Sequence, residues 1–253
     1  MNVLRARRIV SSHKRGSSWP VVAETDDGPL LVKLRGAAQG TAALVAEVIV
    51  AELADALGLA VPRRALLRLH PDVECADRDQ ELGDLLRASE GLNLGFRFLE
   101  GAREIGSEDA AATSDDFACP VLWLDALVMN PDRTPRNPNV LVAEGRSWLI
   151  DHGAALPFQY AWNALTEDAP RSAAYPLDRH LFATRAHRLG HWDQRLAARL
   201  TREVVDEAIA QVPDDFLFPL LDRAPDADRL RRRRSAYHAF LWKRLKPPRP
   251  FVV

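Results

Sequence analysis

The sequence predicts an α+β protein, with a small antiparallel sheet and one helix in its first part and a larger, mainly helical second part. Three observations support this class. Short apolar runs separated by turn residues fill positions 8–34, a helical periodicity follows at 41–58, and the pattern beyond residue 155 is almost wholly helical. The chain has 253 residues, of which 47% are hydrophobic and 27% charged, which is enough for two packed parts.

The first part is expected to begin with strands at residues 8–10, 19–23 and 30–34. Asp27 and Gly28 supply the left-handed backbone of a tight hairpin turn, so the second and third strands should be antiparallel neighbours. A helix is expected over 41–58 with Gly58 at its C-terminal cap, then strands at 65–69 and 94–99. The polar stretch 72–81 is expected to be a surface loop. Glu100 and Gly101 suggest a bend, which divides the chain into domains 1–101 and 102–253.

The second part is expected to start with a buried helix, because residues 120–130 are apolar almost all round and Pro120 suits a first helical turn. Residues 140–142 and 148–150 predict the two strands of a hairpin, with its turn at 144–146. Amphipathic helical stretches are expected near 193–211 and 226–245. The four arginines at 231–234 favour a solvated helix face, with a docking patch for an acidic partner as the alternative.

Charge, cysteine content and hydropathy argue against several classes of protein and of partner. The formal net charge of −1 gives no basic excess, so nucleic acid is not expected as a partner. Cys75 and Cys119 match no zinc spacing and are expected to be buried free thiols, as in a reducing cytoplasm. No stretch resembles a signal peptide or a membrane span, so we expect a cytoplasmic protein without membrane insertion. Three histidines are expected to be core or surface residues rather than metal ligands: His180, His187 and His191.

The strongest functional pattern lies in residues 130–153. Asp132 and Asn137 are five residues apart, and the hairpin is expected to bring Asn137 beside Asp151, which begins an Asp-His-Gly triplet. Phosphoryl transfer needs a carboxylate to accept the hydroxyl proton, and an amide and a carboxylate to hold magnesium against the phosphates. We therefore expect Asp132 to be the catalytic base and Asn137 and Asp151 the metal ligands. The alternative is that the asparagines only shape turns and Asp151 caps a helix.

Two features of the first part suit nucleotide binding. Lys33 ends the third predicted strand, as a lysine for the α and β phosphates should. The following helix carries Glu47 and Glu52, and either could pair with Lys33; Glu47 is favoured because it lies closer to the helix start. The loop at 11–18 has small residues whose backbone amides could approach phosphate oxygens, although a plain polar hairpin loop is the alternative. Its candidate residues are Ser12, Gly16 and Ser17.

These residues resemble those of the HipA-like kinases and, more distantly, the phosphatidylinositol kinases, both variations on the protein-kinase fold. The resemblance rests on residues that occur in the same order in the chain: Lys33, Glu47, the Asn-x-Asp-Arg at 130–133, Asn137 and the Asp151 triplet. It implies a two-lobed fold with ATP and Mg²⁺ as cofactors and a hinge that holds adenine, formed by Phe98, Leu99 and Glu100 with Gly101. Thr134 stands where relatives often have histidine.

The expected function is therefore an ATP-dependent kinase that transfers the γ-phosphoryl group to a hydroxyl, with serine or threonine of a protein as one acceptor. A small-molecule or lipid kinase is the alternative within enzymes. A pseudokinase that acts as an interaction module is the alternative outside them. The joint presence of Lys33, Asp132, Asn137 and Asp151 argues against the pseudokinase, because an unused site has no physical reason to keep a base and two metal ligands.

Overall fold

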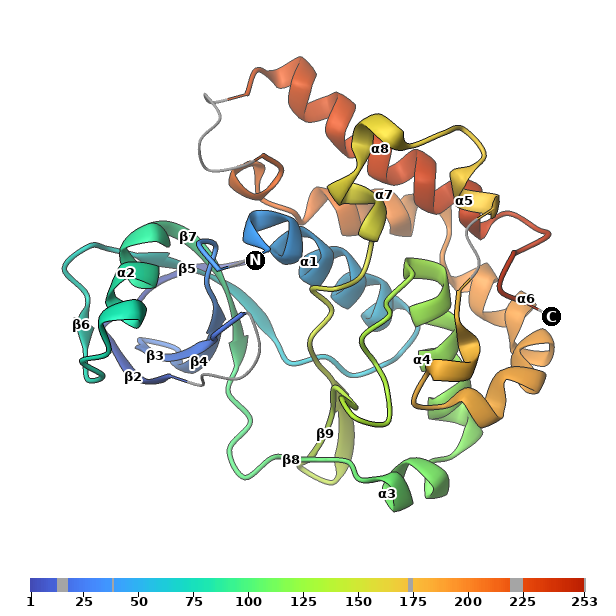
Figure 1. The fold of residues 1–253 in the computed structure, drawn as a ribbon, viewed down its shortest axis with the longest axis horizontal. Coiled ribbons are helices and arrows are strands. Elements are labelled where there is room, and N and C mark those ends of the chain that lie inside the picture. Colours follow the sequence, from blue (N-terminus) through green and yellow to red (C-terminus); the bar gives the residue numbers. More distant parts are fainter. Residues whose placement is uncertain (13–17, 38, 173–174, 219–224, 253) are drawn as a thin grey trace. The chain divides into compact units, whose positions relative to one another are not determined.

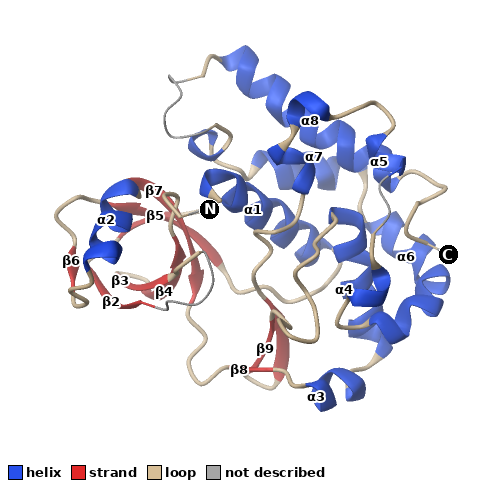
Figure 2. Cartoon of the chain, viewed as in Figure 1, coloured by secondary structure: helices blue, strands red, loops and turns tan. Residues whose placement is uncertain are grey.

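A computed structural model of the chain describes residues 1–12, 18–37, 39–172, 175–218 and 225–252. The chain forms two compact units. The first contains Met1–Val45, Pro62–Glu100 and Pro213–Arg223, and the second contains Ala46–Val61, Gly101–Val212 and Ala224–Val253. Most strands belong to the first unit and most helices to the second (Figures 1 and 2). The predicted α+β class is therefore confirmed. Among the residues described, no helix is both long and apolar enough to cross a membrane.

The first unit is built on a seven-stranded sheet with the order β1-β5-β7-β4-β3-β2-β6. The pairs from β5 through β7, β4 and β3 to β2 are antiparallel, as predicted. The outer pairs, β1 with β5 and β2 with β6, are parallel, so the expectation of a purely antiparallel sheet is wrong at both edges. Parallel partners must be far apart in the chain, because each needs a crossover connection, and hairpin signals cannot reveal them. The strands are β1 (Val3–Arg5), β2 (Arg8–Ser12), β3 (Val21–Thr25), β4 (Gly28–Lys33), β5 (Arg64–Leu69), β6 (Glu74–Cys75) and β7 (Gly91–Arg97).

The hairpin between β3 and β4 forms where the sequence predicts it. Thr25 is paired with Gly28, whose φ of +93° is left-handed and suits a residue without a Cβ. The Thr25 hydroxyl donates to the Gly28 carbonyl at 2.7 Å, and the Asp27 amide donates to the same hydroxyl at 3.1 Å. These bonds fix the turn, and with it the register that places Lys33 as the last residue of β4, opposite Leu94.

The stretch 72–81 is not the plain surface loop that its polarity predicts. It contains the two-residue strand β6 and the start of α2 (Gln80–Ala88). Strand β6 is too short to show any alternation, which is why the pattern misses it. Helix α2 is capped by Asp79, whose carboxylate accepts from the Glu81 amide at 2.8 Å. Its apolar face closes a core that includes Ala6, Ile9, Val21, Ala23, Leu30, Val32, Leu34, Ala65, Leu67, Leu69, Leu82 and Leu86.

Helix α1 (Gly40–Ala56) ends as predicted, since Gly58 has a φ of +79° and the Leu59 amide donates to the Ala54 carbonyl at 2.9 Å. From Ala46 onward α1 belongs to the second unit. That unit also contains α3 (Ser107–Ala112), α4 (Asp115–Val128), α5 (Ala169–Ser172), α6 (Leu189–Arg199), α7 (Arg202–Ala210) and α8 (Ala227–Leu245). A second sheet has the order β10-β9-β8, with β8 (Arg103–Glu104), β9 (Val140–Ala143) and β10 (Arg146–Leu149). Short 3-10 helices cover Pro157–Tyr160, Trp162–Ala164, Leu177–Arg179, Ala183–Arg188 and, in the first unit, Asp214–Phe216.

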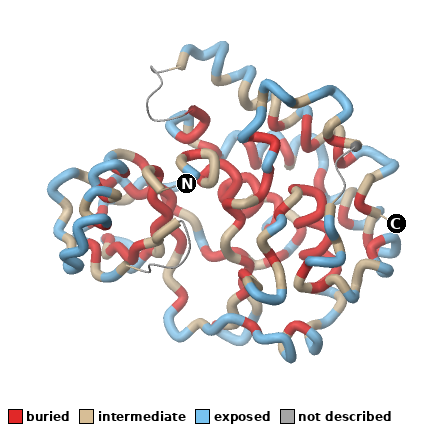
Figure 3. Tube along the Cα trace, in the orientation of Figure 1, coloured by how far each residue is buried: buried red, intermediate tan, exposed pale blue. Residues whose placement is uncertain are grey.

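Two helices of the second unit differ from their predicted limits. Helix α4 starts at Asp115, so Pro120 lies inside it rather than in its first turn, and every residue from Ala118 to Val128 is buried (Figure 3). Proline removes only one N–H bond here, close to the helix start. The stretch 193–211 forms two helices, not one. Helix α6 ends with Leu200 as its C-cap, and Thr201 is the N-cap of α7. Helix α8 matches the expected stretch at 226–245.

Candidate functional site

The candidate site is a polar loop between the buried helix α4 and the hairpin of β9 and β10. Helix α4 ends at Met129, whose left-handed backbone, with a φ of 58°, turns the chain out of the helix. The hairpin pairs Val140 with Leu149, and its register continues beyond the strands, where the Ile150 amide donates to the Asn139 carbonyl at 3.1 Å. The segment before β9 and the segment after β10 therefore meet at one end of the hairpin, as the sequence predicts.

Asp132 is held in this loop by three asparagines. Its amide donates to Asn130 Oδ1 at 3.1 Å, and its carbonyl accepts from Asn137 Nδ2 and Asn139 Nδ2, both at 3.3 Å. Asn139 Nδ2 also lies 3.4 Å from Asp132 Oδ2. The carboxylate is only partly buried, so its backbone is tied on both sides while the side chain stays accessible. An accessible carboxylate on a fixed backbone is what a proton acceptor needs.

Asn137 lies directly beside Asp132 and is held by Thr134. The Thr134 amide donates to the Asn137 carbonyl at 3.0 Å, and the Asn137 amide donates to the Thr134 carbonyl at 3.1 Å. The Asn137 amide also lies 3.2 Å from the Thr134 hydroxyl. Because the side-chain nitrogen of Asn137 donates to Asp132, its carboxamide oxygen is the atom available as a ligand. Thr134 thus positions Asn137.

Asn139 and Asp151 both have a left-handed backbone, with φ values of 49° and 56°. Asparagine and aspartate tolerate this conformation better than other residues with a Cβ. Asp151 is half-buried and directly follows Ile150, whose amide is bonded to Asn139. The carboxylate of Asp151 therefore sits at the same end of the hairpin as Asp132 and Asn137.

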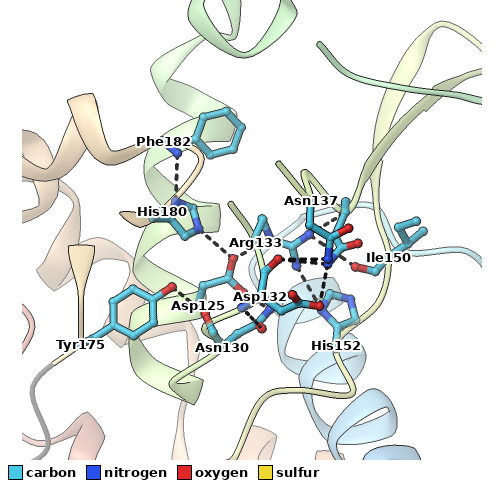
Figure 4. A network of polar contacts seen from close by, with 11 residues as sticks. Asp125, Asn130, Asp132, Arg133, Asn137, Ile150, His152, Tyr175, His180 and Phe182 are labelled. Carbon is cyan, nitrogen blue, oxygen red and sulfur yellow. Dashed lines mark hydrogen bonds and ion pairs between the residues drawn. The ribbon is translucent and has the colours of Figure 1, made fainter. Parts of the chain in front are cut away.

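Behind the loop lies a fully buried network centred on Asp125 of α4 (Figure 4). The exposed fraction is 1% for Asp125 and 0% for Arg133. The Asp125 carboxylate accepts three hydrogen bonds: from Arg133 Nε at 2.6 Å, from His180 Nε2 at 3.0 Å and from Asn130 Nδ2 at 3.0 Å. Burial alone would raise the pKa of Asp125, but the guanidinium of Arg133 and the bond from His180 outweigh it and hold that pKa well below its ordinary value. Asp125 is therefore ionised.

The ring of His180 is neutral in this network. Its Nδ1 accepts from the Phe182 amide at 3.0 Å, so Nε2 carries the hydrogen that is donated to Asp125. Burial lowers the pKa of His180 and outweighs the opposing effect of Asp125. The network extends to Tyr175, whose hydroxyl donates to the Asn130 carbonyl at 2.6 Å. The sequence left core and surface positions open for His180, and the structure places it in the core, with an exposed fraction of 2%.

The residues predicted to bind nucleotide in the first part of the chain are divided between the two units. Lys33 is buried at the end of β4 in the first unit, and Glu47 is buried in the part of α1 that belongs to the second unit, so their pairing stays a prediction. Ser12 ends β2, and its hydroxyl donates to the Asp77 carboxylate at 2.8 Å. Gly16 and Ser17 lie outside the described residues.

The predicted hinge directly follows β7. The Phe98 amide donates to the Pro29 carbonyl at 3.1 Å, which continues the pairing of β7 with β4, while Leu99 is buried. Glu100 is exposed and Gly101 has a φ of +67°, so the chain turns here, where the first unit passes into the second. A role of these residues toward adenine stays a prediction.

Two residues of the loop could together hold a hard cation such as Mg²⁺. In the described part of the chain, no group of three or more histidine, cysteine, aspartate or glutamate residues could hold a metal ion. Asp151 and Asn137 offer one carboxylate and one amide oxygen, and Mg²⁺ is commonly held by one or two carboxylates together with phosphate oxygens and water. Cys75 and Cys119 are free thiols, as predicted, but only Cys119 is buried; Cys75 lies in the edge strand β6 and is partly exposed, so the expectation of burial is wrong for it.

Sequence reasoning missed Asp125, and with it the roles of Arg133 and His180. One signal was present. Asp125 is the only charged residue in the apolar run from Pro120 to Asn130, and a carboxylate inside a buried helix requires a buried partner. The identity of that partner could not be read from spacing, because His180 is 55 residues away.

The fold, with a seven-stranded sheet and a helical part, is consistent with that of a kinase-like protein. The chain belongs to the HipA-like kinase family, whose family model matches residues 6–232, and the resemblance predicted from the residues is thereby confirmed. A solved structure of similar fold is the proinflammatory kinase CtkA of Helicobacter pylori. It is 10% identical, with a TM-score of 0.55, over 96% of this chain and 92% of that chain. At this identity the likeness concerns the fold alone. No curated protein matches the sequence.

Proposed function

We propose that this chain is an ATP-dependent kinase that transfers the γ-phosphoryl group of ATP to a hydroxyl. In this proposal the fold is the two-lobed protein-kinase-like fold, with residues 1–101 as the N-lobe and 102–253 as the C-lobe. Membership of the HipA-like kinase family supports the activity. The observation that carries it is the arrangement around Asp132, a partly accessible carboxylate on a backbone fixed from both sides.

Asp132 is the proposed catalytic base. Its contacts to asparagines use the amide, the carbonyl and Oδ2, so Oδ1 is the oxygen offered to an incoming hydroxyl. Because Asn139 donates toward Oδ2, the plane of the carboxylate is constrained and Oδ1 has a defined direction. The role of Asp132 is to orient the acceptor hydroxyl and to take its proton as the bond to phosphorus forms.

Asn137 and Asp151 are the proposed ligands of Mg²⁺, and Lys33, supported by Glu47, is the proposed contact for the α and β phosphates. Bound Mg²⁺-ATP would supply the transferable phosphoryl group and the positive charge that stabilises it during transfer. Asn137 is suited to its role because its side-chain nitrogen is already bonded to the Asp132 carbonyl, which leaves the carboxamide oxygen as the ligand atom. Ser12, Gly16 and Ser17 are proposed for the phosphates, and residues 98–100 for adenine.

The experiment is label transfer from γ-³²P-ATP to the protein itself, to a lysate and to a small-molecule fraction. Three variants are compared with the wild type: Asp132→Asn, Asp151→Asn and, as a matched control, Asp116→Asn. Asp116 is exposed in the first turn of α4, so the control removes the same charge outside the loop. We expect the rate of Asp132→Asn to fall by about 10²–10⁴-fold, the usual contribution of a positioned base, and that of Asp116→Asn to stay unchanged.

A thermal-shift titration separates binding from catalysis. Mg²⁺-ATP must raise the melting temperature of the wild type if the native state binds it, and Asp151→Asn should weaken the magnesium dependence of that rise. Stabilisation without label transfer in any fraction would make the chain a pseudokinase. No stabilisation at millimolar nucleotide, or full transfer by Asp132→Asn, would overturn the proposal.

A further inference from the structure

The guanidinium of Arg133 contacts the segments on both sides of the hairpin at once. Its Nε is paired with Asp125, while Nη1 donates to the Asn139 carbonyl and to the Ile150 carbonyl, the latter at 3.4 Å. Its Nη2 lies 3.3 Å from His152 Nδ1. One buried side chain thus joins helix α4, the residue before β9 and the segment after β10 (Figure 4).

These contacts enclose the proposed metal ligand. Ile150 precedes Asp151 and His152 follows it, and Arg133 bonds to both neighbours. Arg133 also directly follows Asp132, the proposed base. A displacement of the guanidinium would therefore move the backbone on both sides of Asp151 relative to Asp132.

We infer that Arg133 is a positioning residue that sets the Asp151 carboxylate relative to Asp132 and Asn137, and so controls metal affinity at the proposed site. The inference rests on the proposed function. Arg133 does not touch the reacting groups itself, because it is fully buried behind the loop.

Only arginine can make this set of contacts. The planar guanidinium offers N–H groups in a fixed fork, so it can bond to a carboxylate on one side and to carbonyls and a ring nitrogen on the other. Lysine carries the same charge on a single nitrogen and could keep the pairing with Asp125 but not the fork. Arg133→Lys therefore keeps the positive charge and removes the forked hydrogen bonds, so it tests the two contributions separately.

The chain contains a matched control for the role of a merely structural arginine. Arg244 of α8 is also fully buried in the second unit, and it donates to the carbonyls of Ala126, Leu127 and Pro170, each at 2.9 Å. Two of these carbonyls lie at the end of α4, yet none belongs to the loop or to the segment after β10. Arg244→Lys should disturb packing to a similar degree without moving Asp151.

The first measurement is hydrogen exchange of the peptide 139–153 by mass spectrometry in the absence of nucleotide. The Ile150 amide is protected by its bond to the Asn139 carbonyl, which Arg133 also holds. We expect faster exchange of this peptide in Arg133→Lys and wild-type exchange in Arg244→Lys.

The second measurement is Mn²⁺ binding, followed by the loss of the free-ion EPR signal in the presence of a non-hydrolysable ATP analogue. We expect Arg133→Lys to weaken Mn²⁺ binding by about 10–100-fold, the usual effect of losing a residue that orients a metal ligand. Arg244→Lys should bind with wild-type affinity. If Arg133→Lys fails to fold, His152→Leu provides a milder test, because it removes one acceptor of Arg133 and leaves the Asp125 pair intact; it should weaken Mn²⁺ binding in the same direction.

The outcomes are distinguishable. Selective loss of protection and of Mn²⁺ affinity in Arg133→Lys supports the inference. Wild-type Mn²⁺ affinity in Arg133→Lys or in its substitute His152→Leu, or equal losses in Arg244→Lys, overturns it while leaving the proposed function in place. A wild-type protein that neither binds Mn²⁺ with nucleotide nor transfers phosphate overturns the proposed function and the inference together.

Discussion

Replacing Asp125 by asparagine should destabilise the protein strongly, although the two side chains have nearly the same shape. The carboxylate accepts from three donors, on Asn130, Arg133 and His180. An amide has one acceptor oxygen, and its NH₂ group would face at least one of these donors. The substitution also leaves the guanidinium of Arg133, with an exposed fraction of 0%, without a counter-charge. Breaking a buried ion pair from one side costs about 3–5 kcal/mol.

The assay is urea unfolding followed by far-ultraviolet circular dichroism. With an m-value of about 3 kcal/mol per molar urea, the expected loss lowers the midpoint by about 1–2 M. Asp116→Asn, exposed on the same helix, should lose about 1 kcal/mol or less, through the helix dipole alone. The double variant Asp125→Leu with Arg133→Met should be more stable than Asp125→Asn, because no unpaired charge remains. Equal midpoints for Asp125→Asn and Asp116→Asn would refute the reasoning.

Two further predictions concern pH and packing. Because burial holds the pKa of His180 below its unfolded value of about 6.5, its contribution to stability is complete above about pH 6.5. As the pH falls, that contribution to the free energy of unfolding is lost, by up to about 1.4 kcal/mol per pH unit. Between pH 6.5 and 5 the urea midpoint should therefore fall more steeply for wild type than for His180→Gln. Equal slopes of midpoint against pH for the two proteins would contradict this. A Cβ at Gly36 would lie 2.8–2.9 Å from atoms of Ser89 and the Ala88 backbone, so Gly36→Ala should cost about 1–3 kcal/mol. Gly83 lies inside α2, and a Cβ there would be 3.6 Å from the end of the flexible Arg87 side chain, so Gly83→Ala should instead gain about 0.5–1 kcal/mol. Melting temperatures that were both above or both below that of wild type would be inconsistent with these contacts.

The parts of the fold that sequence predicts well are those specified by neighbouring residues. The β3–β4 hairpin follows from Asp27 and Gly28, and the β9–β10 hairpin from two short apolar runs around Gly145, which has a φ of +73°. Helix α1 follows from its periodicity and the Gly58 cap. The parallel edges of the sheet, β1 with β5 and β2 with β6, depend on partners more than 60 residues apart, and no local pattern records such pairings.

The candidate site divides in the same way. The placement of Asp132, Asn137 and Asp151 at one end of β9 and β10 could be predicted, because it depends only on a short loop and a hairpin. Their support could not be found, because it comes from Asp125 in a helix and from His180 far along the chain. Spacing within one segment indicates candidate residues for the site, whereas their buried partners depend on packing between distant segments.

The left-handed backbone at Asn139 and Asp151 places a second constraint on these positions, independent of chemistry. In a saturation library, glycine at position 151 would keep the backbone conformation and lose the proposed metal ligand, whereas valine would lose both, since β-branched residues rarely adopt positive φ. The yield of folded protein and the rate of phosphoryl transfer should therefore rank the substitutions in different orders. An alanine scan alone would assign to catalysis a loss that belongs partly to the shape of the chain.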